Sequence, residues 1–109
     1  MAVFFDVDPK KLLNYLLSTA TPEAAGKSRF FHGAGFTAEA WQALQAALLA
    51  HPLRAALEYE DPSSPYGRKL IFRCTLPGAP NGRAYCVRSV WQLRGGVYWF
   101  LTAYPQSDR

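Results

Sequence analysis

The sequence predicts an α+β domain in which two or three N-terminal helices pack on an antiparallel meander sheet of three or four strands. Three observations lead to this prediction. Leucines recur at helical spacing in the first half of the chain, aromatic and β-branched residues fill the second half, and glycine-containing turns divide that half into hairpins. The length of 109 residues suits a single domain, residues 1–109.

The first helix is predicted to begin after Asp8, a good N-cap, with Pro9 at the first helical position. It carries leucines at positions 12, 13, 16 and 17 and should end near Ser18, since Thr21-Pro22 indicates a turn.

A short second helix is predicted from Pro22 or Gly26 to His32. Thr37 then caps a third helix, which Pro52 should stop. One face of this third helix carries Trp41, Leu44, Leu48 and Leu49.

The second half of the chain predicts strands over residues 54–60, 69–76, 84–93 and 97–104, of which the first is the weakest. Asn81-Gly82 and Gly95-Gly96 supply the positive-φ residues that two hairpins need.

The register of the last hairpin depends on its turn. A three-residue turn at 94–96 would place Trp91 opposite Trp99, both in the core near Trp41. It would also place Arg88 opposite Thr102 on the open face of the sheet, with Tyr104 one step along. A two-residue turn would shift the register by one residue and reverse the faces.

Cys74 and Cys86 flank the predicted turn around Pro80, and we expect them on neighbouring strands with their Cα atoms within about 7 Å. Two cysteines make no disulfide framework and fit no zinc spacing. In a reducing compartment we expect them to be reduced thiols.

Composition excludes several classes of protein. With 50% hydrophobic and 15% aromatic residues the chain is not intrinsically disordered, and it has no apolar run long enough to cross a membrane. The N-terminus resembles no signal peptide. We expect a cytoplasmic protein, or a domain delivered by machinery that the sequence does not encode.

Charge is uneven along the chain. Residues 1–61 hold five basic and seven acidic side chains, whereas residues 62–109 hold seven basic side chains and one acidic one. A basic half rich in arginine and tyrosine suits contact with phosphates and stacked bases, and equally a sheet with one solvated face. The candidate nucleic-acid-binding residues are Arg68, Lys69, Arg73 and Arg83.

Arg88, Thr102 and Tyr104 share the open face in the expected register, where an arginine, a hydroxyl and a phenol can hold a phosphate. General acid–base chemistry also needs a titratable group. Of the two histidines, His51 is expected to interact with the helix dipole as a structural group at a helix C-terminus, and for His32 a solvated or capping role is the simpler interpretation. No motif indicates a metal or a cofactor.

Several segments together resemble an uncharacterised bacterial domain family that occurs alone and at the C-termini of polymorphic toxins. They are Lys11-Leu-Leu-Asn-Tyr-Leu-Leu17, Gly26-Lys27-x-x-Phe30-Phe31, Gly35-Phe36, the helix with Trp41, Gly82-Arg83, Val90-Trp91 and Leu101-Thr-Ala-Tyr-Pro105. The layout of that family is similar to small metal-independent RNase toxins of the barnase, colicin and RelE types.

The resemblance implies an RNase-like toxin domain that acts on RNA and is held by a cognate immunity or antitoxin protein. The polar positions it points to are Lys27, Arg88, Thr102 and Tyr104. Members often carry a histidine just before the lysine, which this chain lacks, and His32 is the available substitute. The alternative is a non-catalytic module that binds a protein or nucleic acid through the basic sheet face.

Overall fold

The computed structural model describes residues 4–18, 25–61 and 68–105 and has the predicted α+β architecture. Its elements in chain order are β1 (Phe4–Asp6), α1 (Pro9–Lys11), the π-helical turn η1 (Leu12–Leu16), α2 (Ala25–Gly33), α3 (Trp41–Arg54), β2 (Ala56–Asp61), β3 (Lys69–Leu76), β4 (Tyr85–Arg94) and β5 (Val97–Pro105). The turn predicted at Thr21-Pro22 lies outside the described residues.

The sheet has five strands in the order β1-β5-β4-β3-β2. Strands β2 to β5 form the predicted antiparallel meander, whereas β1 pairs in parallel with β5. The expectation of a purely antiparallel sheet was wrong in this respect. The sequence signal for β1 is weak because the strand has only three residues. Its partner β5 is distant along the chain, so no turn between the two strands indicates the pairing.

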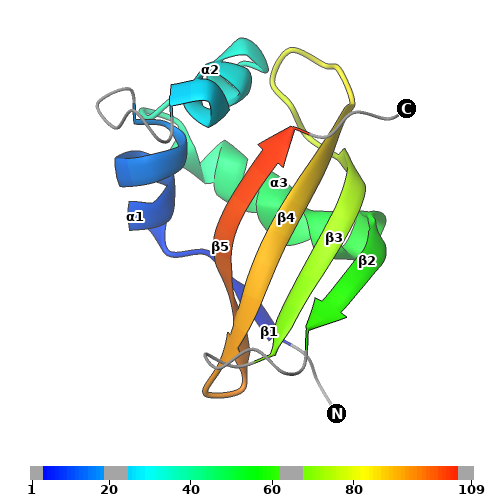
Figure 1. Ribbon diagram of the computed structural model, residues 1–109. Helices are drawn as coiled ribbons and strands as arrows, with labels where there is room; N and C mark the ends of the chain where they lie inside the picture. The colour runs from blue at the N-terminus through cyan, green and yellow to red at the C-terminus, as the bar shows by residue number, and fades with distance from the viewer. Residues whose placement is uncertain (1–3, 19–24, 62–67, 106–109) are drawn as a thin grey trace.

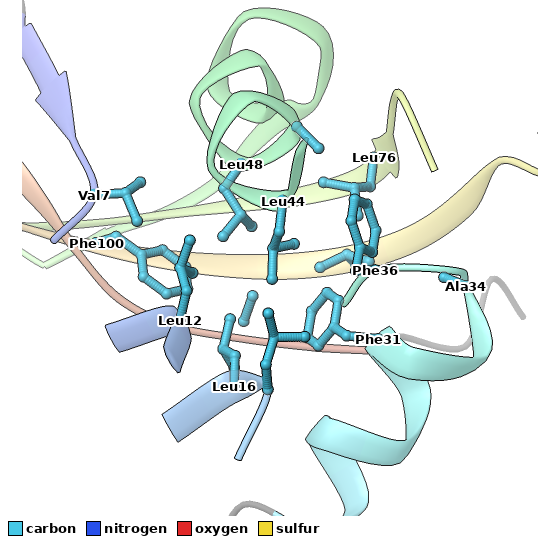
Figure 2. Packing of buried hydrophobic residues seen from close by; sticks show 14 of the residues in the cluster. Val7, Leu12, Leu16, Phe31, Ala34, Phe36, Leu44, Leu48, Leu76 and Phe100 are labelled. Atoms are coloured by element: carbon cyan, nitrogen blue, oxygen red, sulfur yellow. The ribbon is translucent and has the colours of Figure 1, made fainter. Parts of the chain in front are cut away.

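Helix α3 crosses one face of the sheet, which we call the inner face, while α1 and α2 lie beside β5 (Figure 1). Leucines of α3 and η1 and phenylalanines of α2 and β5 point into one shared core (Figure 2). The opposite, open face carries no helix in the described part of the chain. Thr37 is not the cap of the third helix, which begins at Trp41 after Ala40; its hydroxyl accepts a hydrogen bond from the backbone N–H of Ala40 in the turn before the helix. That helix does not stop at Pro52 but continues to Arg54.

The turn between β4 and β5 has two residues, Gly95 and Gly96, with φ of 56° and 83°. This is the type of turn that matches the twist of a hairpin. The expected three-residue turn was therefore wrong. Trp99 lies opposite Gln92 and is half-buried rather than in the core, whereas Trp91 is fully buried as expected.

A β-bulge in β5 returns the residues that follow it to the face on which they were expected. Trp91 pairs with Phe100, but the next residue, Val90, pairs with Thr102, so Leu101 is the extra residue on β5. Beyond the bulge Thr102 and Tyr104 lie on the open face, as the sequence predicted. Arg88 faces Tyr104 rather than Thr102.

The cysteines form a disulfide, so the expectation of reduced thiols was wrong. Their Cα atoms lie 3.9 Å apart on the neighbouring strands β3 and β4, within the predicted limit. Cys86 is opposite Thr75, one residue from the expected register, and Cys74 has a φ of 90° that departs from normal strand geometry. Composition and spacing do not report the oxidation state of a cysteine pair, which is why the sequence missed the bridge.

No described helix is both long and apolar enough to cross a membrane.

Candidate functional site

The site is built around Lys27, in the N-terminal half of α2. Its ammonium group donates a hydrogen bond to the Tyr15 hydroxyl at 2.5 Å and another to the Thr102 hydroxyl at 3.1 Å. The two hydroxyl oxygens are themselves 3.4 Å apart. All three side chains are half-buried, so a lysine, a phenol and an alcohol from η1, α2 and β5 converge at one point.

The short length of β1 makes this convergence possible. β1 pairs only with the beginning of β5, up to Trp99. Beyond that point the edge of β5 is taken up by the helical segments, which contact it directly. Tyr15 and Lys27 therefore reach Thr102 from the side of the sheet.

Tyr104 connects this triad to Arg88. The Arg88 guanidinium donates to the Tyr104 hydroxyl at 3.4 Å and lies 5.8 Å from the centre of its ring. The Lys27 ammonium is 5.9 Å from the same ring centre. The ring of Tyr104 thus contacts two cations. We call Tyr15, Lys27, Arg88, Thr102 and Tyr104 the basic cluster.

The electrostatics of the cluster act on Tyr15. Burial alone would raise the pKa of this phenol, but hydrogen bonds from Lys27 and Thr102 and the charges of Lys27 and Lys11 outweigh burial. The net result is a pKa below the ordinary value of 10.0. Lys11 lies with its ammonium group 5.8 Å from the centre of the Tyr15 ring. A phenol in this position ionises more readily than a solvated one.

The cluster can hold an anion and move a proton. Lysine and arginine neutralise a phosphate, arginine by hydrogen bonds in a fixed plane and lysine as a compact charge. Thr102 supplies a hydroxyl donor, and the phenols of Tyr15 and Tyr104 can each take a proton from a bound molecule or give one to it. Among the described residues, no group of three histidine, cysteine or acidic side chains could hold a metal ion.

Four of the five predicted catalytic residues meet in the structure: Lys27, Arg88, Thr102 and Tyr104. His32 is exposed at the end of α2, and its Nε2 lies 3.0 Å from the carbonyl oxygen of Leu17. A carbonyl only accepts, so Nε2 carries the proton. This contact ties α2 to the end of η1, and no described contact connects His32 with the cluster.

Sequence reasoning missed Tyr15. Its partners Lys27 and Thr102 are distant along the chain, and in the sequence it reads as one more residue of an amphipathic helix. The signal was its position inside the Lys11–Leu17 segment, which also carries the leucines of the core.

The predicted nucleic-acid-binding residues lie at different places. Arg73 of β3 is opposite Arg88 and half-buried, so it borders the cluster. Lys69 is farther along β3, opposite Gln92. Arg68 is exposed and forms a 3.0 Å ion pair with Glu60, and Arg83 is exposed in the connection between β3 and β4.

The fold and the cluster define a small α+β domain with a cationic, hydroxyl-bearing site where helices meet the edge of its sheet. The chain belongs to the family described as Domain of unknown function (DUF6883), which it matches over residues 4–107.

Its fold is similar to a chain in the structure "Contact-dependent growth inhibition toxin - immunity protein complex from Klebsiella pneumoniae 342". The TM-score is 0.75 at 19% sequence identity, with 93% of this chain and 92% of that chain covered. No curated protein matches the sequence.

Proposed function

We propose that this domain binds RNA and cleaves its phosphodiester bonds without a metal ion, as a toxin-type ribonuclease. The observation that carries the proposal is the position of the Lys27 ammonium, which bonds Tyr15 and Thr102 and faces the Tyr104 ring beside Arg88. Two cations can stabilise the charge of the transition state, and an alcohol and a phenol of lowered pKa can orient the phosphate and take up a proton.

Each residue of the cluster then has a role. Lys27 and Arg88 bind the non-bridging oxygens of the scissile phosphate, and Thr102 orients them. Tyr15 as phenolate takes the proton of the ribose 2′-hydroxyl, whose oxygen attacks phosphorus. Tyr104 gives its proton to the departing 5′-oxygen, so a 2′,3′-cyclic phosphate and a 5′-hydroxyl are formed.

The basic residues of the sheet extend the binding surface. We assign Arg73 to a phosphate next to the scissile one, because it lies opposite Arg88. Lys69 and the exposed Arg68 and Arg83 would add attraction that depends on salt. The roles of these four residues and of His32 stay predictions.

Likeness to a chain from a toxin–immunity complex supports a toxin-related or immunity-related role, and the proposal takes the first of these. A cognate immunity or antitoxin protein would then be the natural partner, and the cytoplasm, where RNA is found, the place of action. Such a partner would be acidic where it meets the basic cluster.

The test is incubation of the pure protein with total RNA in EDTA. We expect cleavage by the wild type and a loss of about 100-fold or more in rate for Lys27→Met and Arg88→Gln, since each removes charge stabilisation from the transition state. Arg29→Ala is the matched control, because Arg29 is exposed on the same helix as Lys27 and its loss changes net charge equally. Absence of cleavage by the wild type, or equal rates in all four proteins, contradicts the proposal.

A second candidate function is binding without catalysis. It is favoured by the occurrence of the similar chain in a complex with a protein partner. Under this alternative RNA or an acidic protein binds the basic cluster, the Lys27 and Arg88 variants lose binding, and no cyclic phosphate ends appear on the RNA.

A further inference from the structure

A pocket of about 310 Å³ lies next to the basic cluster. It opens where the N-terminal segment leaves β1 and enters α1, against the side of β5. Its lining residues are Asp8, Lys11, Arg94, Trp99, Phe100 and Leu101. The volume is at the lower end of the range for small-ligand sites, which suits a planar group the size of a nucleobase.

The hairpin geometry creates this pocket. The two-residue turn places Trp99 opposite Gln92, away from the core that takes Tyr98 and Phe100. The indole is half-buried, so part of it remains accessible from the pocket. The parallel strand β1 ends opposite Trp99, and the chain then turns into α1, whose Lys11 forms another side of the pocket.

Two cations border this indole. The Arg94 guanidinium donates to the side-chain oxygen of Gln92 at 3.0 Å, which holds it beside the strand. Lys11 lines the pocket and also faces the Tyr15 ring, so it lies between the pocket and the cluster. Leu101 of the pocket directly precedes Thr102 of the cluster, and Trp99 is only about 10 Å away along the strand.

An accessible aromatic ring bordered by cations is the usual platform for a base of a single-stranded nucleic acid. The base stacks on the ring, and the cations attract the phosphates on either side. A base in a duplex cannot stack in this way, because its faces are covered by its neighbours.

We propose that this pocket is a nucleobase-binding subsite in which an unpaired base of RNA stacks on Trp99 while Lys11 and Arg94 contact its flanking phosphates. The proposal rests on the proposed function, because the scissile phosphate would occupy the basic cluster one strand segment away. It adds a preference for single-stranded RNA and assigns that preference to Trp99.

The test compares binding of three probes: a short 2′-O-methyl oligoadenylate, its abasic counterpart and a duplex of the same length. The 2′-O-methyl group removes the nucleophile, so binding is measured without cleavage. We expect Trp99→Ala to weaken oligoadenylate binding about 5- to 150-fold, the range for loss of one stacked base, and to leave binding of the abasic oligomer unchanged. Trp99→Phe should retain most of the affinity, and the duplex should bind wild type and Trp99→Ala equally.

Leu53→Ala is the control, because Leu53 is an exposed apolar side chain on α3. Equal affinity of wild type and Trp99→Ala for oligoadenylate overturns the subsite. Lys27→Met separates this failure from that of the proposed function. If Lys27→Met weakens binding of both oligomers while Trp99→Ala weakens neither, the cluster binds RNA without this subsite. If the wild type binds no probe, both proposals are wrong.

Discussion

His51 of α3 is fully buried against the inner face of the sheet, and every polar atom of its ring has a partner. Nε2 donates to the carbonyl oxygen of Cys74 at 2.5 Å, and Nδ1 lies 2.6 Å from the hydroxyl of Ser89. In the neutral ring Ser89 donates to Nδ1 and accepts from the indole N–H of Trp91 at 2.9 Å. The role of His51 is structural, as expected, but its ring bonds β3 and β4 of the sheet rather than acting on the dipole at the end of its helix.

The stability of the protein should depend on the protonation of His51. Burial lowers its pKa below 6.5, although hydrogen bonds to the backbone of Cys74 and Val87 oppose the shift. The unfolded chain then binds more protons than the folded one below pH 6.5. We expect the free energy of unfolding to be at its full value above that pH. As the pH is lowered from 6.5 to the folded-state pKa of His51, the free energy of unfolding should fall by at most about 1.4 kcal/mol per pH unit.

Urea unfolding at a series of pH values measures this dependence. In His51→Gln the part of the slope that belongs to His51 should vanish. An unchanged slope in this variant would show that other groups cause the pH dependence.

Tyr15 also makes the protein more stable as the pH rises, here because folding favours its ionised form. Its folded-state pKa lies below 10.0, so the extra stability is present above pH 10.0 and is lost as the pH falls through the folded value. In an ultraviolet titration of tyrosinate, we expect an ionisation below pH 10.0 that is present in the wild type and missing in Tyr15→Phe. In the Lys27→Met variant the pKa of Tyr15 should be higher than in the wild type. Identical titration curves for the wild type and both variants would contradict the assignment of this ionisation to Tyr15.

At the scale of elements, strands β3 and β4 are joined by the Cys74–Cys86 bridge across a sequence separation of 12 residues. The bridge restricts the unfolded chain more than the folded one. We expect Cys74→Ser/Cys86→Ser, or reduction of the wild type, to lower the free energy of unfolding by about 3 kcal/mol.

Denaturant unfolding with and without a thiol reductant measures this effect. The double variant should be insensitive to the reductant, which is the internal control. Equal stability of the oxidised and reduced wild type would be the contrary result.

The element bounds were largely predictable, whereas the pairing between elements was less so. β3 spans the predicted residues because alternation and turn residues are local signals. The register of β4 and β5 depended on whether Arg94 belongs to the turn, and a sequence with a basic residue before two glycines allows both answers. The bulge at Leu101 has no sequence signal of its own, yet it is what returns Thr102 and Tyr104 to the face of Arg88.

At the scale of the whole molecule, the candidate site was predictable where it depends on the sheet and on one helix. Alternation and the family resemblance brought Lys27, Arg88, Thr102 and Tyr104 together. Tyr15 and the pocket at Trp99 required β1, because that strand sets where the helical segment meets β5. A short parallel strand gives no local pattern, so the features that depend on it could be found only in the structure.

Strand β1 is also packed by side chains. Phe5 stacks on Tyr98 at 5.4 Å between ring centres and contacts Trp91 edge-on at 5.2 Å. Phe5→Ala should therefore destabilise the protein by up to about 3 kcal/mol. Most of this change should appear as faster unfolding in stopped-flow measurements, with refolding nearly unchanged. Slower refolding with unchanged unfolding would contradict the expectation that β1 docks late in folding.

The parallel pairing of β1 with β5 sets the order in which the chain can assemble. Within the domain Phe4 leaves the ribosome early and its partner Val97 leaves late, so the hairpins of β2 to β4 can form before β5 is available to pair with β1. Contacts between distant parts of a chain form slowly, because the intervening loop must close first. Until β1 docks on β5, Tyr15 and Lys11 are not held against β5. The basic cluster and its neighbouring pocket therefore come into existence only when translation of the domain is essentially complete.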